Sequence, residues 1–210
     1  MFRIGVLASG NGTNLQAIID AVERGDLPVT IAVVVSNRRK AMALERARRH
    51  GVPAVVVPMK RYATREAHEE AVERHLRAAE VDLVVLAGYD RVVGQTLLAA
   101  YPGRMINVHP GLLPAFAGTL HAQEMALEHG VKVAGCSVHF VTPEVDAGPI
   151  VVQRAVEVRE DDTVETLKAR ILAEEHKALP EAIRLIAEGR VRIEGRRVRV
   201  LPPAHPIRRA

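Results

Sequence analysis

The sequence predicts an α/β fold: a doubly wound, mostly parallel sheet, with antiparallel strands and a long helix in the C-terminal half. Strand-like and helix-like segments alternate up to residue 109, and the strand-like segments are continuous apolar runs such as 30–35 (TIAVVV) and 82–86 (DLVVL). Strands that are apolar on both faces are typical of parallel sheets covered by helices on both sides. Two later strand-like segments, near 132–141 and 149–158, are joined by too few residues for a parallel crossover, so we expect them to be antiparallel.

The first half of the chain supplies the parallel strands. Residues 4–8 form a short apolar run, residues 9–14 (SGNGTN) form a turn, and apolar residues then recur at helical spacing from Leu15 to Val22. Gly25 to Pro28 end that helix. By the same criteria we expect strands at 30–35, 54–57, 82–86 and up to His109, and helices at 40–50, 65–79 (with Ala67, Ala71, Val72, Leu76 and Ala79 on one face) and 94–100.

The second half adds a helix near 121–129, the antiparallel pair and a long helix at 163–187. Pro180 lies inside the long helix, and a proline there is expected to kink or split it. Segments 191–193 and 198–200 flank a turn and predict a hairpin. We expect one domain over 1–190, with a phosphate-binding half (1–100) and a catalytic half (101–190), followed by a hairpin and a loose tail over 191–210. The apolar residues expected to face inward on the long helix are Val164, Leu167, Ile171, Leu172, Leu179, Ile183 and Ile186.

Composition is that of an ordinary globular protein, with 48% hydrophobic and 26% charged residues among 210. No segment has the apolar length of a membrane span, so no membrane partner is expected. The N-terminus runs directly into a strand pattern without a signal peptide, which predicts a cytoplasmic location. The single cysteine, Cys136, excludes an internal disulfide framework and a cysteine-cluster metal site, and we expect it to pack in the core.

The positive charge of the chain comes mostly from arginine. Lysine and arginine total 29, of which five are lysine, and the net charge is +4. Guanidinium groups suit phosphate and carboxylate ligands. The arginines at 196–199 and 208–209 have no aromatic residues between them. They are typical of a solvated basic edge, and we expect no nucleic-acid partner.

Asn107, His109 and Asp146 are the candidate catalytic residues. Asn107 and His109 lie two apart at the end of an apolar strand, so their side chains share a face at the edge where open α/β sheets bind ligands. A working histidine usually has an orienting charge, which Asp146 could supply. The alternatives are two polar residues satisfied by nearby backbone, and an Asp-Ala-Gly-Pro turn in which Asp146 bonds locally.

The turn at 9–14 is a candidate anion site, because it joins a strand to a helix N-terminus. It lacks the glycine spacing of a dinucleotide fold and the lysine of a P-loop, so it favours a monophosphate. The alternative is a glycine-rich turn with an asparagine or threonine helix cap. His121, His129, His139 and His176 have no metal-ligand spacing, so we expect no metal, and we interpret His139 and His176 as structural or supporting residues.

Together these motifs resemble the folate-dependent phosphoribosylglycinamide formyltransferase family over nearly the whole chain. The resemblance implies a Rossmann-like formyltransferase fold. It also implies a cytoplasmic protein that binds no metal and is a monomer or homodimer. It implies transfer of the formyl group of 10-formyltetrahydrofolate to the amine of glycinamide ribonucleotide in de novo purine biosynthesis. The segments that carry it are 7–18 (LASGNGTNLQAI), 35–37 (VSN), 84–89 (VVLAGY), 106–114 (INVHPGLLP), 137–142 (SVHFVT) and 146–150 (DAGPI).

The resemblance also implies roles for individual residues. The ribonucleotide phosphate is expected at Gly12, Thr13 and Asn14, with Glu175 near the ribonucleotide. Asn107 and a protonated His109 are expected to stabilise the oxyanion of a tetrahedral intermediate, with Asp146 holding His109 and favouring its imidazolium form. The expected folate contacts are Arg65, Asp90, Arg91, Val92, Val93, Asn107, Thr142 and Glu144.

Two departures from the family pattern concern ligand binding. Asp90 stands where an apolar residue is usual beside the pterin pocket, and 118–123 contains one residue more than usual before the next helix. The competing functions are a formyltetrahydrofolate hydrolase, which carries an extra N-terminal domain, and a methionyl-tRNA formyltransferase, which needs a sizeable C-terminal domain. A phosphate-ligand sensor would explain the first turn and leave Asn107, His109 and Asp146 without a purpose.

Overall fold

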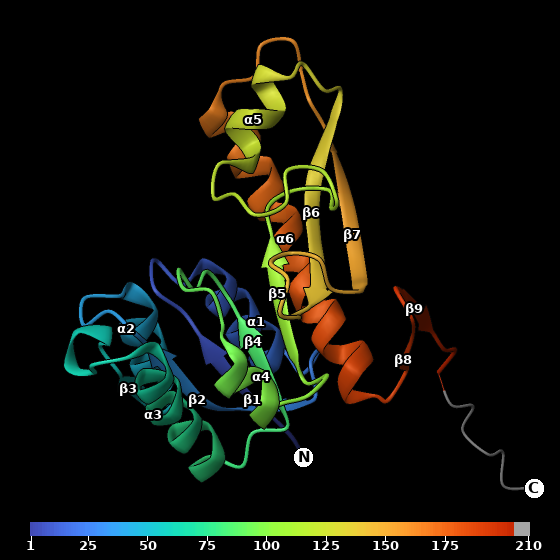
Figure 1. Ribbon diagram of the computed structural model, residues 1–210. Helices are drawn as coiled ribbons and strands as arrows, with labels where there is room; N and C mark the ends of the chain where they lie inside the picture. The colour runs from blue at the N-terminus through green and yellow to red at the C-terminus, as the bar shows by residue number, and fades with distance from the viewer. Residues whose placement is uncertain (204–210) are drawn as a thin grey trace, which may run out of the picture.

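The computed structural model describes residues 1–203, which form a seven-stranded sheet with helices on both faces and a separate two-stranded sheet (Figure 1). The strand order is β3-β2-β1-β4-β5-β6-β7. The strands are β1 (Phe2–Leu7), β2 (Val29–Ser36), β3 (Ala54–Val56), β4 (Leu83–Leu86), β5 (Met105–His109), β6 (Val133–Phe140), β7 (Ile150–Glu157), β8 (Val191–Glu194) and β9 (Arg197–Val200). The helices are α1 (Thr13–Glu23), α2 (Met42–Arg49), the 3-10 turn η1 (Met59–Arg61), α3 (Arg65–Ala78), α4 (Gln95–Ala100), α5 (Ala122–Glu128) and α6 (Val164–Ala187).

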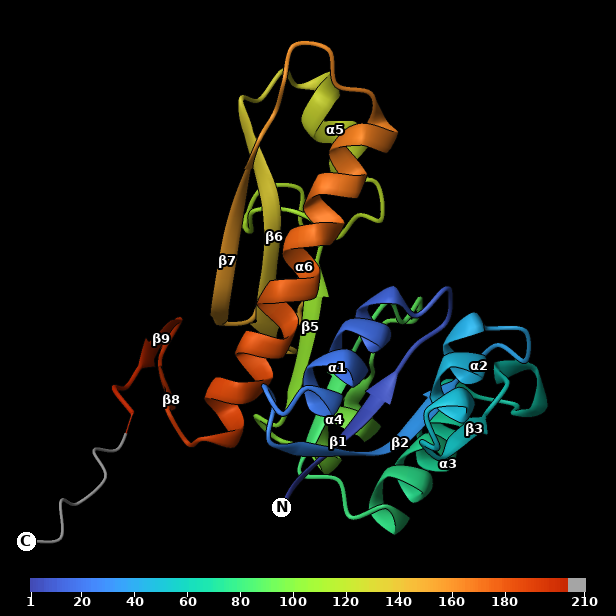
Figure 2. The ribbon, with the colours of Figure 1, turned by 180° about the vertical axis from the view of Figure 1, so that it is seen from behind.

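The sheet is parallel from β3 to β5 and antiparallel beyond, which confirms the predicted fold class. One apolar core lies between the sheet and α1, α2 and α6, and a second lies on the face covered by α3 and α4. Figure 2 shows α6 running along β6 and β7 and reaching α1, so this helix joins the two halves of the sheet. The central strands β1, β2, β4 and β5 are largely buried on both faces, in agreement with their continuous apolar runs.

Local sequence signals explain where the helices begin. Gly12 precedes α1 with a φ of 70°, and a Cβ there would lie 2.6 Å from the Ala43 Cα of α2, so only glycine fits. The Thr64 hydroxyl caps α3 by accepting a hydrogen bond from Ala67 N–H at 3.1 Å. Thr163 and Thr166 form a reciprocal capping box at the start of α6.

The long helix α6 is continuous through Pro180, so of the two effects expected of this proline, a kink or a split, the split is wrong. A proline removes one backbone hydrogen bond, while the neighbouring residues Ala178, Leu179, Ala182 and Ile183 are all fully buried in the core. Tertiary packing therefore keeps the helix intact. Of the apolar residues expected to face inward, Leu167, Ile171, Leu179 and Ile183 are buried, and Val164, Leu172 and Ile186 are partly buried.

The C-terminal hairpin of β8 and β9 is formed as predicted. Residues 204–210, which include Arg208 and Arg209 and most of the predicted tail, lie outside the described residues. Within the part of the chain that is described, no helix is both long and apolar enough to cross a membrane. Cys136 is fully buried on β6, as expected for a core residue.

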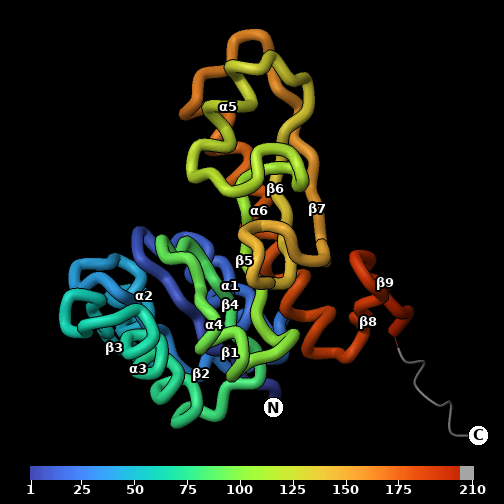
Figure 3. The backbone as a smooth tube through the Cα atoms, viewed as in Figure 1, coloured from blue at the N-terminus to red at the C-terminus, as the bar shows by residue number. Residues whose placement is uncertain are grey.

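The loop from 110 to 121 leaves the end of β5 and passes over β6 (Figure 3). Leu113 N–H donates to the Ser137 hydroxyl at 3.0 Å, and that hydroxyl donates to the Gly111 carbonyl at 2.7 Å. These buried contacts fix the first residues after His109 against the neighbouring strand.

Candidate active site

The C-terminal end of β5 opens into a pocket of about 450 Å³. Asn107 and His109 both line it, as expected for two residues on one face of a strand. The other walls come from the loop after β4, the loop after β5, the end of β6 with the following loop, and one face of α6. The remaining lining residues are Asn14, Leu86, Gly88–Val93, Val108, Pro110, Gly118–Leu120, Gln123, His139, Val141, Thr142, Val145, Asp146, Lys168, Leu172 and Glu175.

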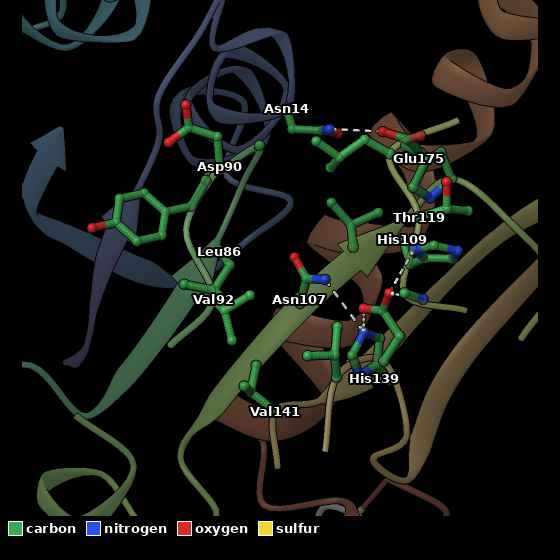
Figure 4. A pocket seen from close by; sticks show the side chains of 18 of the residues that line it. Asn14, Leu86, Asp90, Val92, Asn107, His109, Thr119, His139, Val141 and Glu175 are labelled. Carbon is green, nitrogen blue, oxygen red and sulfur yellow. Dashed lines mark hydrogen bonds and ion pairs between the residues drawn. The ribbon is translucent and has the colours of Figure 1, made fainter. Parts of the chain in front are cut away.

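Asp146 lies beside His109, although 36 residues separate them in the sequence. Its Oδ2 is 3.3 Å from His109 Nδ1 and accepts a hydrogen bond from Gly118 N–H at 2.9 Å. Its two oxygens lie within ion-pair distance of two histidine rings, those of His109 and His139, which are labelled in Figure 4. The alternative in which Asp146 is only a local turn residue is therefore wrong, because its carboxylate reaches other segments of the chain.

The backbone of the 141–149 loop brings this carboxylate into the pocket. Asp146 has a φ of 53°, a left-handed conformation that aspartate tolerates better than most residues. At Gly148 a Cβ would lie 1.8 Å from the Phe140 carbonyl oxygen, so only glycine allows the loop to return this closely to β6. The Asp-Ala-Gly-Pro sequence thus shapes the loop and aims its acid inward.

His139, which the sequence indicates as a structural or supporting residue, is part of the same cluster. Its Nε2 is 3.4 Å from Asp146 Oδ1 and 3.3 Å from Asn107 Nδ2, and its Nδ1 donates to the Phe140 carbonyl at 2.9 Å. Asn107 and His139 are direct partners in the antiparallel pairing of β5 and β6. The strand register therefore places His139 where it can orient both the carboxamide and the acid.

Burial controls the charge of His109. Removal from water lowers the pKa of its imidazole, and the Asp146 carboxylate offsets this only in part, so the pKa lies below its usual value. Desolvation therefore outweighs the attraction to Asp146 in the ligand-free protein, whereas the protonated His109 expected from the sequence belongs to the tetrahedral intermediate. The His109 Nδ1 is the ring nitrogen that faces Asp146. The other ring nitrogen, Nε2, is buried with no hydrogen-bond partner among residues 1–203.

Asp146 stays ionised. Burial alone would raise the pKa of its carboxyl, but the hydrogen bonds from His139 and from Gly118 N–H outweigh burial and hold the pKa below its usual range. The site therefore holds a neutral imidazole beside a fixed negative charge. Such a pair is prepared to accept a proton.

A second polar group lies where α1 meets α6. Asn14 Nδ2 donates to Glu175 Oε2 at 2.8 Å, and Asn14 Oδ1 is buried without a partner in the described structure. Burial raises the pKa of Glu175, although the Asn14 hydrogen bond opposes the shift. Gly12 and Thr13 do not line the pocket themselves but form the N-terminus of α1 at its edge.

The α1 N-terminus has the properties of an anion site. No described side chain caps it, so the first N–H groups of the helix are free to bind a ligand, and the alternative of an asparagine or threonine cap is wrong. Arg46 lies against the turn, where its Nε donates to the Asn11 carbonyl at 2.8 Å and its Nη1 to Gln16 Oε1 at 3.1 Å. A guanidinium at this point adds positive charge beside the free N–H groups.

The expected folate residues fall into two groups. Asp90, Arg91, Val92, Val93 and Thr142 line the pocket, whereas Arg65 and Glu144 do not. The Asp90 carboxylate is engaged away from the pocket: it accepts from Asn37 Nδ2 at 2.7 Å and forms an ion pair with Arg38. These bonds, with one from Ser9, lower the pKa of Asp90 in spite of its burial. The acidic residue at position 90, which departs from the family pattern, therefore changes how the loop after β4 is anchored.

Several lining residues had no assigned role from the sequence. Lys168 and Leu172 lie seven and three residues before Glu175, which was already expected near the ribonucleotide, and share its face of α6, so helical spacing was the signal that could have found them. Leu120, from the segment with the extra residue, lies at the pocket and is 81% exposed. Residues 1–203 contain no group of three or more histidine, cysteine, aspartate or glutamate side chains able to hold a metal ion.

Comparisons with known proteins agree with this geometry. Residues 2–183 match the formyl transferase family. The chain is 43% identical to phosphoribosylglycinamide formyltransferase of Bacillus subtilis, over 88% of this chain and 94% of that protein. It superimposes on glycinamide ribonucleotide transformylase 1 from Symbiobacterium toebii with a TM-score of 0.94 and 60% identity, over 96% of this chain and 95% of the other.

The same segment also occurs within larger proteins. The chain is 42% identical over 191 residues to the trifunctional purine biosynthetic protein adenosine-3 of Bos taurus, and it spans 19% of that protein's length. The family predicted from the sequence motifs is thus confirmed by full-length relatives and by structure. The chain belongs to the formyl transferase family and, within it, to the phosphoribosylglycinamide formyltransferases.

Proposed function

We propose that this protein transfers the formyl group of 10-formyltetrahydrofolate to the primary amine of glycinamide ribonucleotide, a step of purine biosynthesis. The observation that carries the proposal is the position of the Asn107, His109 and Asp146 cluster. It lies in one pocket between an uncapped helix N-terminus and a largely apolar wall. An anionic substrate and a folate can therefore meet at the same catalytic groups.

The ribonucleotide is assigned to the α1 end of the pocket. Its phosphate binds the N–H groups at Gly12, Thr13 and Asn14, where the positive end of the helix and Arg46 both favour an anion. Asn14 Oδ1 and Glu175 supply acceptors for the ribose hydroxyls or the amine. These groups hold the reacting amine near His109.

The folate is assigned to the wall formed by the loop after β4. Arg91, Val92 and Val93 line that side, with Thr142 and Asn107 opposite. Asp90 contributes through its backbone, since its carboxylate is bonded to Asn37 and Arg38. Arg65 and Glu144 lie outside the pocket lining and are assigned to the parts of the folate that extend beyond it.

The reaction begins with a proton transfer. A primary amine of this kind has a pKa of about 8, so it enters mainly as an ammonium ion. Neutral His109 accepts one proton from it, and the resulting imidazolium is stabilised by Asp146 at 3.3 Å. The free amine nitrogen then attacks the formyl carbon: a nitrogen–carbon bond forms, and the carbonyl electron pair moves to oxygen.

The oxyanion is stabilised by an Asn107 N–H and by the His109 imidazolium. Removal of one such donor typically costs about a hundredfold to a thousandfold in rate. The amine nitrogen then loses a proton and the folate N10 gains one, the carbon–N10 bond breaks with its electron pair going to N10, and the carbonyl re-forms. The products are formylglycinamide ribonucleotide and tetrahydrofolate, and His109 releases its proton to solvent.

A coupled assay tests the proposal by following folate deformylation with and without glycinamide ribonucleotide. We expect deformylation only when the ribonucleotide is present, with stoichiometric formylation of its amine. Deformylation without the ribonucleotide would show a hydrolase, and no deformylation in either case would overturn the assignment of an enzyme.

A further inference from the structure

A buried carboxylate that the reaction does not use lies behind the folate wall, which is the side of the pocket lined by Arg91, Val92 and Val93. Glu69, in the second turn of α3, is 4% exposed. Its Oε1 accepts a hydrogen bond from Gly94 N–H at 2.6 Å, and its Oε2 accepts one from Leu97 N–H at 3.3 Å. A buried carboxylate is costly unless it is hydrogen-bonded, and bonds from backbone N–H groups to a charged acceptor are among the stronger ones.

These two bonds connect α3 to the end of the folate wall. Gly94 directly follows Arg91, Val92 and Val93, which line the pocket, and it is the residue from which α4 begins. No side chain of its own segment caps α4 in the described structure, so Glu69 supplies the cap from another helix. The position of the wall therefore depends on a side chain that does not line the pocket.

Arg65 joins the same cluster. Its Nε is 4.0 Å from Glu69 Oε1, one helical turn earlier on α3, and its side chain is about half exposed. A Cβ on Gly94 would lie 2.7 Å from Glu69 Oε1 and 3.0 Å from Arg65 Nε, so the three residues are packed without room for another atom. Glu69 thus bonds to the wall and faces the Arg65 guanidinium with the same oxygen atom.

We propose that Glu69 is a positioning residue for folate binding. It fixes residues 91–93 through Gly94 and orients Arg65 toward the same side, so that the wall and the cation are ordered before the folate arrives. Ordering in advance increases affinity, because binding no longer loses that conformational freedom. The identity of the ligand as a folate rests on the function proposed above.

The test compares Glu69→Gln with Glu70→Gln, a matched change at an exposed neighbour on the same helix. Glutamine keeps the shape of Glu69 but replaces one acceptor oxygen with an amide group that cannot accept from an N–H. For Glu69→Gln we expect the Kd of tetrahydrofolate to rise about tenfold or more, from the loss of one charge-assisted hydrogen bond. We expect the KM for the ribonucleotide to change less than twofold, and Gly94 and Leu97 amides to exchange faster with solvent.

The outcomes separate positioning from a purely structural cap. Faster amide exchange with unchanged folate affinity would show that Glu69 only caps α4, and the proposal would fail. An equal weakening of folate binding and rise in the KM for the ribonucleotide would also overturn the proposal. Glu69→Asp, which keeps the charge but shortens the side chain, should bind folate between the wild type and Glu69→Gln, and serves if the amide variant does not fold. Wild-type protein that binds no folate would instead contradict the proposed function.

Discussion

The replacement of Asp146 by asparagine isolates its charge, because the two side chains have nearly the same shape. An asparagine oxygen can still accept the hydrogen bond from Gly118 N–H, now 2.9 Å long. What is lost is the attraction between a carboxylate and an imidazolium whose nearest atoms are 3.3 Å apart. Coulomb's law gives about 5 kcal/mol for unit charges at that separation with an effective dielectric constant of about 20.

This attraction acts mainly after His109 has taken a proton, so its loss raises the barrier more than it weakens binding. Each factor of ten in rate corresponds to about 1.4 kcal/mol, so even half of the Coulomb energy would slow turnover by nearly a hundredfold. We expect Asp146→Asn to reduce kcat at least a hundredfold. Asp146→Ala, which also removes the acceptor for Gly118 N–H, should reduce it at least as much with the fold intact.

The same variant has a predicted pH dependence. Asp146 raises the pKa of His109 against the effect of burial, so its loss moves that pKa further down. The acidic limb of the kcat/KM profile should therefore shift to lower pH while the plateau falls. Glu70→Gln is the control for a carboxylate-to-amide change. Near-normal turnover in Asp146→Asn, or an acidic limb that moves to higher pH, would refute the reasoning.

Three further outcomes follow from the site. His109→Ala should reduce kcat at least a hundredfold while thermal unfolding is little changed; near-normal turnover would remove His109 from the reaction. Thr13→Ala should mainly raise the KM for the ribonucleotide, and an effect on folate affinity alone would mean that the two subsites are reversed. Asp90 and Asp146 have lowered pKa values when folded, so the unfolded chain binds more protons in acid. The free energy of unfolding should thus fall as the pH drops from about 4 toward the folded pKa values. Asp90→Asn should make this fall with pH less steep. If denaturant titrations of the variant showed the same pH dependence as the wild type, the contribution of Asp90 would be contradicted.

Most of the fold could be predicted from the sequence because its strands are continuous apolar runs and its helices have a clear apolar period. The alternation of the two indicated the parallel part, and a short connection indicated the antiparallel pair. Pro180 does not split α6, since packing of the rest of the helix outweighs one lost backbone bond. Local signals were sufficient wherever burial and periodicity agreed.

The catalytic cluster could be predicted only in part. Asn107 and His109 are neighbours on a strand, so their shared face follows from spacing. The approach of Asp146 depends on how the loop between β6 and β7 returns to β6 at Gly148, which a local pattern does not specify. The neutral state of His109 depends on its burial, and the involvement of His139 depends on the register of β5 with β6. Both are properties of the tertiary structure.

Glu69 is a second residue whose role depends on the tertiary structure and could not be predicted from the sequence. The apolar period of α3 correctly indicates Ala71, Val72 and Leu76 as buried residues. It passes over His68 and Glu69, which are equally buried because each bonds to backbone of another segment: His68 to the Val57 carbonyl and Glu69 to the start of α4. Polar residues that hold other elements in place have no periodic signal in the sequence.

In the proposed mechanism, a buried, neutral His109 beside an ionised Asp146 receives the proton of the incoming amine. Its most direct test is a titration of the His109 ring by NMR in the ligand-free protein and in Asp146→Asn. We expect a His109 pKa below the ordinary value of about 6.5 in the wild type and a lower one in the variant. A His109 pKa above that value, or one that does not change when Asp146 loses its charge, would contradict it.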